Sequence, residues 1–439
     1  MAHPHTPSQA IRLPFQAPRR QPRLARRRAI RLLAGALFLA ALPATASEPL
    51  PGADVASLHA WLTGHNPELR ALTLEAEAAQ ARIQPAGALP DPTLSLRLAG
   101  LDAGRPWRDA GMGSETTVSV RQPLPLWGKR DLARTSARQD ADASGFDRDA
   151  ALRDLFAQAE SALVRYWHAD MAIAVLDRRI ALLAQIGEIA RVRYALGAAA
   201  QQDAIRAEVE QTRLRRERIE RTAIRRETKA ALNAVLGRSA DAPLATPAGV
   251  PILPIASPPA PGTQSLANHP AVLAQEARAE AAGTRAELQR RERLPDLTVG
   301  IGTMRQRGGP DGMELMLEVE IPFQQRARRE REREARLLAE AALARGNSVL
   351  QELQARDAMA RAQWRSARDR RELTEGTLLP QADATWQSAL ASYQVGEVDF
   401  GTLLEALNEW QGADLDRVDA LRDELLGAAA VRAIEGEAR

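Results

Sequence analysis

Four short segments of the chain alternate between apolar and polar residues, the pattern of a β-strand whose two faces meet different surroundings. Leucine takes every second position in Thr93–Ala99, and valine alternates with Thr, Ser and Arg in Thr116–Arg121. The alternation returns less cleanly in Leu297–Gly302 and in Leu315–Ile321. The first two segments are joined by residues 101–115 and the last two by residues 305–312, and both joining segments are rich in Gly and charge. The sequence therefore predicts two β-hairpins.

A long helical stretch follows each predicted hairpin, after Pro123 and Pro125 in the first case and after Pro322 in the second. Each stretch has about 65 residues, or roughly 100 Å at 1.5 Å per residue, which does not suit a compact domain. In the first stretch an apolar or small residue recurs every seventh position, as in a coiled-coil seam: Leu152, Ala159, Tyr166, Ile173 and Ile180. The second stretch has a weaker seam and more Arg, and Pro380 predicts a kink in it.

Glycine and proline mark the expected helix boundaries. Both long stretches turn back at a glycine, Gly197 and Gly396, the residue type that commonly follows the end of a helix. Before each hairpin, an Ala-rich helical segment of residues 53–88 or 266–293 ends at a Leu-Pro-Asp corner, where the proline stops the helix. Each half of the chain therefore has the same order of elements.

The two halves also match in sequence. NPELRALTLEAEAAQAR from Asn66 matches HPAVLAQEARAEAAGTR from His269, and YALGAAAQQDAIRAEVE from Tyr194 matches YQVGEVDFGTLLEALNE from Tyr393. The matched segments lie about 200 residues apart, the mark of an internal duplication. The sequence predicts two structural repeats and a proline-rich connector between them: residues 47–240, 266–439 and 241–265.

Residues 1–46 have the composition of an export signal. Eight Arg precede an apolar stretch from Leu32 to Leu42, and Ala44-Thr45-Ala46 offers a cleavage site of the small-x-small type. The apolar stretch is shorter than the about 20 residues that a transmembrane helix needs. The sequence therefore predicts a cleaved signal peptide and an exported protein.

Removing this segment changes the charge of the chain. The whole sequence has 59 basic and 56 acidic residues, and the mature chain keeps 51 basic residues against the same 56 acidic ones, a formal charge of −5. The basic pI of 9.7 therefore derives largely from the signal peptide. Charge gives no support for nucleic-acid binding.

The sequence contains no recognisable catalytic or metal-binding pattern. There is no Cys, and the four histidines after the signal peptide are not paired at the spacing that puts two ligands on one helix face: His59, His65, His168 and His269. No nucleophile elbow, P-loop or zinc spacing occurs either. The sequence therefore predicts a protein that is not an enzyme and holds no metal or cofactor.

The hairpins limit how such a chain can fold. In a soluble sheet, four strands on a coiled-coil molecule would leave open edges and an uncovered apolar face. In a bilayer, the alternation is what a membrane strand needs, but every edge must be paired and four strands cannot close a barrel. Several chains must then contribute strands to one barrel, with the long helices extending from it.

The mature chain resembles the TolC family of outer-membrane efflux proteins over essentially its whole length. The resemblance rests on the NPEL segment at Asn66, the QPLPLWGKR elbow at residues 122–130, the two Tyr-x-x-Gly turns and the duplication. It implies a mainly α fold with a membrane β part. Four strands from each of three copies would close a twelve-stranded barrel, continued by a long coiled-coil α-barrel. The Ala-Leu-Pro-Asp-Pro and Gly-Lys-Arg motifs are most similar to heavy-metal or general RND outer-membrane factors.

The resemblance also implies a function, that of the passive exit duct of a tripartite efflux or secretion system. The implied location is the outer membrane with a long periplasmic helical extension. The implied partners are two further copies of the chain, a periplasmic adaptor, an inner-membrane pump of the RND type, and outer-membrane lipid. Many relatives carry a lipid on an N-terminal Cys, and because this chain has no Cys, the barrel alone would anchor it. The competing hypothesis is a periplasmic coiled-coil adaptor or scaffold, which would be soluble once the signal peptide is removed.

By the same resemblance, the two helical turns face the periplasm and contact the adaptor: Tyr194, Leu196, Gly197, Ala198, Tyr393, Val395, Gly396 and Glu397. Family members often narrow the channel with carboxylates just after the second turn. Glu405 falls at one such position, Thr402 stands where another acid can occur, and Asp399 is a weaker candidate. In a trimer, Glu405 would form a ring of three charges that responds to cations. The alternatives are glycines that only cap helices and a solvated glutamate.

Two further groups of residues lie near the predicted strand ends. Methionine thioethers suit Cu(I), but with no His or Cys nearby, apolar packing or lipid contact is the favoured interpretation of Met304, Met313 and Met316. Aromatic residues in this region are candidates for a membrane-interface girdle: Trp107, Trp127 and Phe323. The alternative for Trp127 and Phe323 is packing at the elbow that follows each hairpin.

Overall fold

The computed structural model describes residues 50–99, 115–247, 249–251, 266–306 and 309–435. The predicted signal peptide, most of the first hairpin loop and residues 252–265 of the connector lie outside the described residues. The chain divides into two units, residues 1–48 and 49–439, and the second unit holds every described element. Within the described part, no helix combines the length and the apolar character that crossing a membrane requires.

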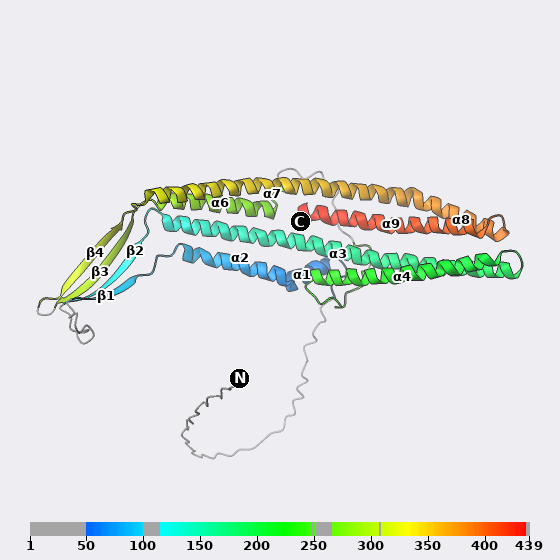
Figure 1. Cartoon of the computed structure of the whole chain (residues 1–439), viewed down its shortest axis with the longest axis horizontal. Coiled ribbons are helices and arrows are strands. Elements are labelled where there is room, and N and C mark those ends of the chain that lie inside the picture. Colours follow the sequence, from blue (N-terminus) through cyan, green and yellow to red (C-terminus); the bar gives the residue numbers. More distant parts are fainter. Residues whose placement is uncertain (1–49, 100–114, 248, 252–265, 307–308, 436–439) are drawn as a thin grey trace, which may run out of the picture. The chain divides into compact units, whose positions relative to one another are not determined.

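From α2 and from α6 onward, the described elements occur in the same order in both halves of the chain (Figure 1). The first half contains α1 (Val55–His65), α2 (Pro67–Ala86), β1 (Thr93–Ala99), β2 (Glu115–Leu124), α3 (Lys129–Ala195) and α4 (Gln201–Val235). The second contains α6 (Pro270–Arg291), β3 (Asp296–Gln306), β4 (Gly312–Glu320), α7 (Gln325–Leu373), the π-helical turn η1 (Thr374–Leu378), α8 (Leu379–Val395) and α9 (Phe400–Glu435). The two predicted hairpins and the two long helical stretches are confirmed. The repeat boundaries given above remain a prediction.

The four strands form one antiparallel sheet in the order β1-β2-β3-β4. Val120 of β2 lies opposite both Leu94 of β1 and Ile301 of β3, and Ile301 lies opposite Leu315 of β4. Because directly opposite residues share a face, the register collects the predicted apolar positions of all four strands on one side. Most of those side chains are exposed, with exposed fractions of 71% for Leu94 and 85% for Leu315.

The helix expected over residues 53–88 is divided in two, so that part of the prediction was wrong. The break is at Asn66, whose side chain accepts hydrogen bonds from the backbone N–H groups of Glu68 and Leu69 at 2.9 and 3.0 Å. Pro67 takes the first helical position, where its missing N–H costs nothing. The Asn66 amide also donates to the Val235 carbonyl at 3.0 Å, which fixes the break against the end of α4.

The second long stretch is interrupted just before Pro380, as expected. There, η1 replaces one turn of α-helix, and Leu379 N–H donates to the Thr374 carbonyl five residues earlier. A proline cannot donate to the carbonyl four residues before it, and its ring would clash with that carbonyl in a regular α-helix. The wider π turn accommodates the ring, so α7 continues into α8.

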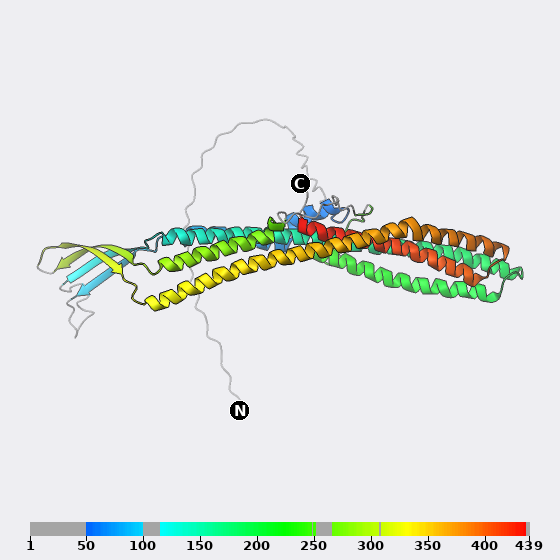
Figure 2. The same cartoon turned by 90° about the horizontal axis from the view of Figure 1, so that it is seen from above.

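The helices lie side by side in two sets that share α3 and α7, with α8 continuing α7 in the second set (Figures 1 and 2). Next to the sheet, α2 packs on α3, α3 on α6, and α6 on α7. Toward the two turns, α4 packs on α3, α3 on α9, and α9 on α7 and α8. The halves of the chain therefore meet where α3 contacts α6 and α9 and where β2 pairs with β3.

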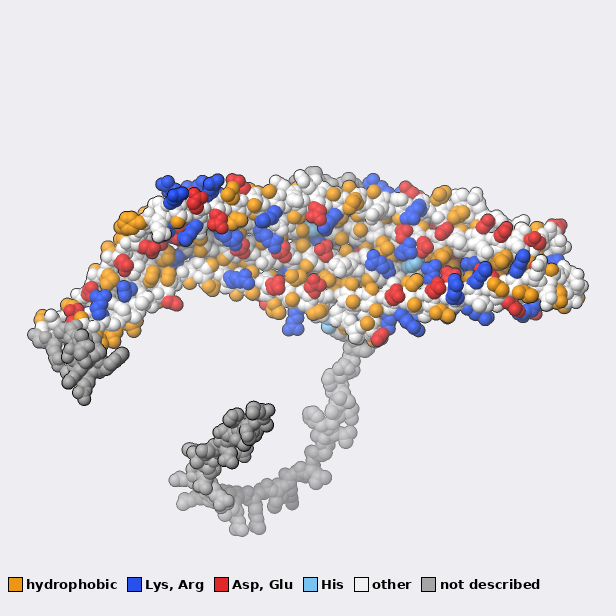
Figure 3. Space-filling view, viewed as in Figure 1, with side chains coloured by type: hydrophobic (Ala, Val, Ile, Leu, Met, Phe, Trp, Pro, Cys, Tyr) orange, Lys and Arg blue, Asp and Glu red, His pale blue; other side chains and the backbone are white. Residues whose placement is uncertain are grey.

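Buried apolar side chains fill the seams between these helices. Toward the turns, one cluster joins α3, α4, α8 and α9: Leu183, Leu214, Trp386, Tyr393, Phe400 and Leu403. A second cluster joins α1, α3 and the end of α4: Leu58, Leu62, Leu163, Tyr166 and Leu232. Basic and acidic side chains are interspersed over the outer helix faces (Figure 3). Most Arg residues therefore lie on solvated faces, where single ion pairs add little stability.

Candidate functional site

The two turns between the long helices have the same backbone hydrogen bonds. At the first, Gly197 N–H donates to the Tyr194 carbonyl at 2.9 Å and Ala198 N–H donates to the Arg193 carbonyl at 2.8 Å. At the second, Gly396 and Glu397 make the equivalent bonds at 3.2 and 2.9 Å. This pattern is a Schellman motif, which needs a left-handed residue after the helix. Gly197 and Gly396 supply it with φ of 70° and 87°.

Arg193 joins the first turn to the second. Its guanidinium hydrogen-bonds to the backbone carbonyl of Tyr393 and stands 4.6 Å from the centroid of the Tyr393 ring. The same side chain donates to the Ala198 carbonyl at 3.3 Å. The two turns, about 200 residues apart in sequence, therefore lie next to each other and form one surface. Sequence reasoning missed Arg193, although it precedes the first Tyr-x-x-Gly turn directly.

The side chains at this surface differ between the two turns. Leu196 and Val395 are 78% and 73% exposed, and Tyr194 is 47% exposed. Tyr393, the counterpart of Tyr194, is only 2% exposed and meets the ring of Phe400 edge-on at 5.9 Å. Burial raises the pKa of its phenol. Tyr393 therefore belongs to the core behind the turn, and its side chain is not available to a partner, contrary to the expectation for this residue.

Asp399 caps the helix that follows the second turn. Its carboxylate accepts a hydrogen bond from the Thr402 backbone N–H at 2.8 Å, which occupies an N–H group that the start of α9 leaves unpaired. Hydrogen bonds from Thr402, first from its backbone and then from its side chain, hold the pKa of Asp399 below its ordinary value. Asp399 thus has a structural role as a cap.

Glu405 lies on an exposed acidic face of α9. It shares this face with Thr402 and with Glu409, Gly412 and Asp416, since steps of three and four residues return to the same side of a helix. All five are exposed, and within the described part of the chain the Glu405 side chain makes no hydrogen bond or ion pair. Sequence reasoning missed Glu409 and Asp416, which the helical spacing from Glu405 could have identified.

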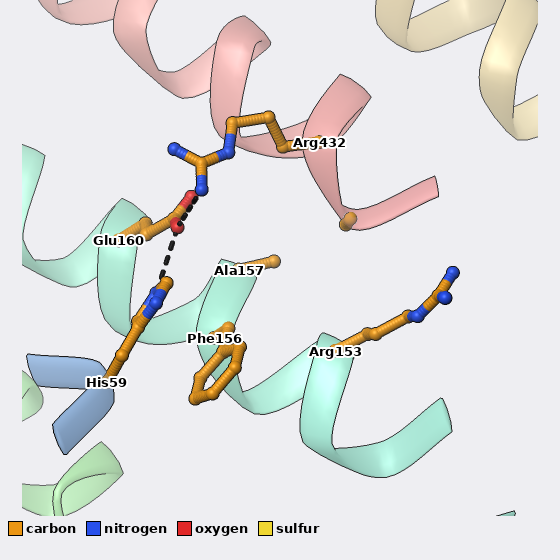
Figure 4. A pocket seen from close by; sticks show the side chains of 7 residues that line it. His59, Arg153, Phe156, Ala157, Glu160 and Arg432 are labelled. Carbon is orange, nitrogen blue, oxygen red and sulfur yellow. Dashed lines mark hydrogen bonds and ion pairs between the residues drawn. The ribbon is translucent and has the colours of Figure 1, made fainter. Parts of the chain in front are cut away.

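A buried charged cluster, separate from the two turns, connects α1, α3 and α9 (Figure 4). Glu160 of α3 is 3% exposed and lies 3.0 Å from His59 Nε2 and 3.3 Å from Arg432 Nη2. His59 also stacks on Phe156, with ring centroids 3.9 Å apart. The adjoining hollow measures about 30 Å³, enough for a water molecule or two. The cluster therefore joins helices and has no room for a ligand.

His168 and His269 are buried where the two halves of the chain meet. His168 Nε2 of α3 hydrogen-bonds to Asp419 of α9 at 2.5 Å, and His269 Nδ1 caps α6 by accepting from Ala271 N–H at 3.2 Å. Burial is the main cause that lowers the pKa of both imidazoles, and it outweighs the bond to Asp419. Both histidines are thus held neutral and serve packing.

The described residues contain no group of three or more His, Asp or Glu side chains placed to hold a metal ion. The register of the second hairpin also separates the three methionines. Met313 lies opposite Thr303, on the apolar face, whereas Met316 lies opposite Gly300 and Met304 opposite Gly312, on the polar face. The copper hypothesis has no support, and lipid contact suits Met313 alone. Trp107 lies outside the described residues.

A four-stranded sheet with one uncovered apolar face, carried on helices that turn back twice, defines the class of TolC-like outer-membrane channel proteins. The chain belongs to the outer membrane efflux protein family, whose model matches residues 62–238 and 262–437.

Individual relatives agree with this assignment. The cobalt-zinc-cadmium resistance protein CzcC of Cupriavidus metallidurans is 24% identical over 378 residues, which cover 85% of this chain and 86% of CzcC. The outer-membrane channel OprN has a TM-score of 0.76 at 18% identity, covering 90% of this chain and 95% of its own. The MtrE outer membrane channel of Neisseria gonorrhoeae has a TM-score of 0.74 at 17% identity, covering 89% and 92%.

The family defines what the protein does. It is an outer-membrane efflux channel of a tripartite system, it works with an adaptor and an inner-membrane pump, and it is not an enzyme. Its long helical part lies in the periplasm. The alternative of a soluble adaptor or scaffold finds no support in these comparisons.

Proposed function

We propose that three copies of this chain form one continuous exit duct, closed by strands in the outer membrane and by helices in the periplasm. The observation that carries the proposal is that the sheet has two open edges, β1 and β4, and one apolar face across all four strands. A strand edge cannot stay unpaired in lipid. Four strands cannot close on themselves, whereas twelve can, so the apolar face would meet lipid and the polar face the lumen.

The helices support the same arrangement. Inside one chain, α3 of the first half packs on α6 and α9 of the second half. The counterpart of α3 in the second half is α7 together with α8, and the counterparts of α6 and α9 in the first half are α2 and α4. These counterparts are the outermost helices: α7 and α8 lie at one end of each row of helices, and α2 or α4 at the other. Exposed apolar side chains occur on these end helices: Leu74, Ile205, Val209, Ile219, Leu337, Leu338 and Leu343. A neighbouring copy would cover them.

The paired turns are the proposed contact surface for the adaptor. Leu196 and Val395 would supply its apolar contacts, with Tyr194, Ala198 and Glu397 beside them, and all five are exposed. The glycines Gly197 and Gly396 would hold the turn shape. Tyr393 would not contact the adaptor itself and would instead support the surface, since its buried ring and its carbonyl hold Arg193 in place.

Glu405 is the proposed gate residue, with Glu409 and Asp416 extending its acidic face along α9. Three copies around one axis would turn each of these carboxylates into a ring of three charges, which favours cations over anions. Asp399 would contribute through the backbone of α9, because it caps that helix. Thr402 would add no charge to the gate.

Divalent transition-metal ions are the proposed cargo. The similarity to CzcC, a cobalt-zinc-cadmium resistance protein, supports this class, and the acidic face of α9 suits cations. Expression of the chain with its pump and adaptor in a metal-sensitive strain should raise tolerance to cobalt, zinc or cadmium. Tolerance to organic drugs without any change for metals would assign the duct to another cargo.

The channel itself is tested by membrane fractionation followed by single-channel recording in a planar bilayer. We expect a trimer in the outer-membrane fraction that gives discrete conductance steps after purification in detergent. A soluble monomer that gives no conductance would contradict the duct and revive the scaffold hypothesis.

A further inference from the structure

The first half of the chain is locked to the second at the point where strands become helices. The elbow after β2, residues 125–129, sits on the Leu294-Pro295-Asp296 corner that leads into β3. The Asp296 carboxylate accepts hydrogen bonds from Leu126 N–H at 3.0 Å and from Lys129 Nζ at 2.7 Å. Lys129 is 4% exposed and also donates to the Leu294 carbonyl at 3.1 Å. This buried cation joins the two halves.

The backbone of the first elbow is shaped for this contact. Trp127 has a φ of 61°, a left-handed value that non-glycine residues rarely adopt. Its indole N–H donates to the Pro295 carbonyl at 2.7 Å, and its own carbonyl accepts from Arg291 at 2.6 Å. The bonds to the corner therefore hold an unfavourable backbone conformation in place. Trp127 packs at the elbow, which was the alternative to a membrane girdle.

A second Leu-Pro-Asp corner and a second elbow that begins with a proline also occur in the chain. The second elbow does not repeat the left-handed backbone of Trp127 and Gly128. The other corner is Leu89-Pro90-Asp91, before β1, and all three residues are exposed. The other elbow runs from Pro322 to Arg326, after β4. Arg326 follows Pro322 by four residues, as Lys129 follows Pro125. Within the described residues, the side chains of Asp91 and Arg326 make no hydrogen bond or ion pair.

One chain cannot bring this second pair together. The first elbow follows β2 and its corner precedes β3, and these strands are neighbours in the sheet. The second elbow follows β4 and the remaining corner precedes β1, which are the two opposite edges of the same sheet. The Pro90 carbonyl of the remaining corner accepts a hydrogen bond from Gln122 Nε2 at 2.7 Å, so the Asp91 carboxylate is the group left open there. Only another copy, placed with its β1 beside β4, can bring an elbow to that carboxylate.

We propose that the second elbow of one copy docks on the first corner of the next copy, with Arg326 paired to Asp91. This inference rests on the proposed trimer and specifies its seam. The backbone N–H of Phe323 would donate to the same carboxylate, as Leu126 does within the chain. Phe323 is 86% exposed in the single chain and would lie at the seam. A group of basic side chains covers the start of α7 (Figure 3), where the sequence places Arg326.

The proposal fixes the register between copies. Within the chain, Leu124 pairs with Leu297, next to the corner. One residue further along, Pro125 faces Asp296. If Pro322 of one copy faces Asp91 of the next in the same way, Val319 lies opposite Leu94, Leu317 opposite Leu96 and Glu318 opposite Ser95. Apolar residues then meet apolar residues on one face across the seam, as they do inside the chain. A shift of one residue would put Leu94 on the face of Glu318 and break this agreement.

The register is tested by disulfide formation, which the absence of native Cys makes unambiguous. In membranes containing the full chain, Glu318→Cys with Ser95→Cys should form covalent dimers and trimers under mild oxidation, since opposite Cβ atoms lie near disulfide distance. Glu314→Cys with Ser95→Cys is the matched control. It is displaced by four residues, about 13 Å along the strand, and should not cross-link.

Charge reversal tests the ion pair. Arg326→Asp should speed subunit dissociation of the purified trimer about tenfold, and adding Asp91→Arg should restore the rate. Arg329→Asp, one turn along the same exposed stretch, should change it little, and circular dichroism would check that each variant is folded. A conducting trimer with neither the cross-link nor the charge effect would overturn the proposed contact between elbow and corner but not the duct. A wild-type chain that stays monomeric would overturn both the proposed contact between copies and the proposed duct.

Discussion

Single buried polar side chains hold the helices of this protein in register. Asn66 fixes the break between α1 and α2 against α4, Glu160 joins three helices, and Lys129 joins the two halves at the sheet. A buried charge is costly unless it is paired. Substitutions at these positions should therefore cost more than substitutions at the many ion pairs on the outer helix faces.

Glu160→Ala should destabilise the protein by about 3–5 kcal/mol, because it removes the buried acceptor shared by His59 and Arg432. Thermal unfolding of the helical signal in detergent would measure the change. Glu208→Ala is the matched control, because its ion pair with Arg191 is exposed on both sides and its removal should have little effect. Equal effects from both variants would contradict a special role for the buried cluster.

Acidification should weaken the protein through His168 and His269. Their pKa values are lowered in the folded chain, so the unfolded chain binds more protons and stability falls as the pH drops below the ordinary value of 6.5. The loss is complete below the folded pKa. Unfolding midpoints between pH 8 and about 5 would show the slope.

His269→Asn isolates one part of this effect. Asparagine caps α2 at the matching position in the first half, so it should cap α6 as well while removing the titrating group. We expect a shallower pH dependence with little loss of stability at neutral pH. An unchanged slope would assign the pH dependence to other groups.

At the scale of elements, the turns between long helices depend on backbone shape more than on side chains. Gly396→Ala should cost about 1–2 kcal/mol, because Gly396 has a left-handed conformation that Cβ disfavours. Hydrogen exchange of the amides around residues 392–400 should speed up. Gly412→Ala, inside α9 with nothing within 4 Å of an added Cβ, should leave those amides unchanged. Comparable exchange in both variants would mean that the turn does not need its glycine.

At the scale of the whole molecule, a duct is built by repeating one junction. The contacts of α3 with α6 and α9, and of β2 with β3, are complete inside the chain, and the proposed trimer uses the same contacts between chains. In that trimer, a residue that is exposed in one copy occurs three times around the trimer axis and forms a ring. Glu405 is the clearest case, because it lies on a helix face with two further carboxylates.

Glu405→Gln should reduce the preference of the open channel for cations and weaken its block by divalent ions, because a ring of three charges is removed. Single-channel reversal potentials in a salt gradient would measure the selectivity, and the current that remains after divalent ions are added would measure the block. Glu208→Gln removes an exposed charge on α4 and should leave the selectivity unchanged. If Glu405→Gln conducts like the wild type, the gate must be formed by other residues.

Features set by local periodicity could be predicted from the sequence alone. Alternation identified the strands, and seven-residue spacing identified α3, because both follow from the geometry of one element. The Gly197 and Gly396 turns and the interruption at Pro380 also follow from the backbone of single residues. The break at Asn66 had a readable signal too, since Asn followed by Pro is a common helix start.

Features set by neighbours distant in sequence were decided only by the tertiary structure. Tyr194 and Tyr393 occupy the same motif, yet one is exposed and the other is buried, because only the second packs against Phe400 and Arg193. The lock of Lys129 on Asp296 likewise appears only once β2 pairs with β3. Sequence alone thus determined the kinds of element and their order, since each is stabilised within a few residues. Which faces are covered depends on contacts between halves, so only the folded chain could decide it.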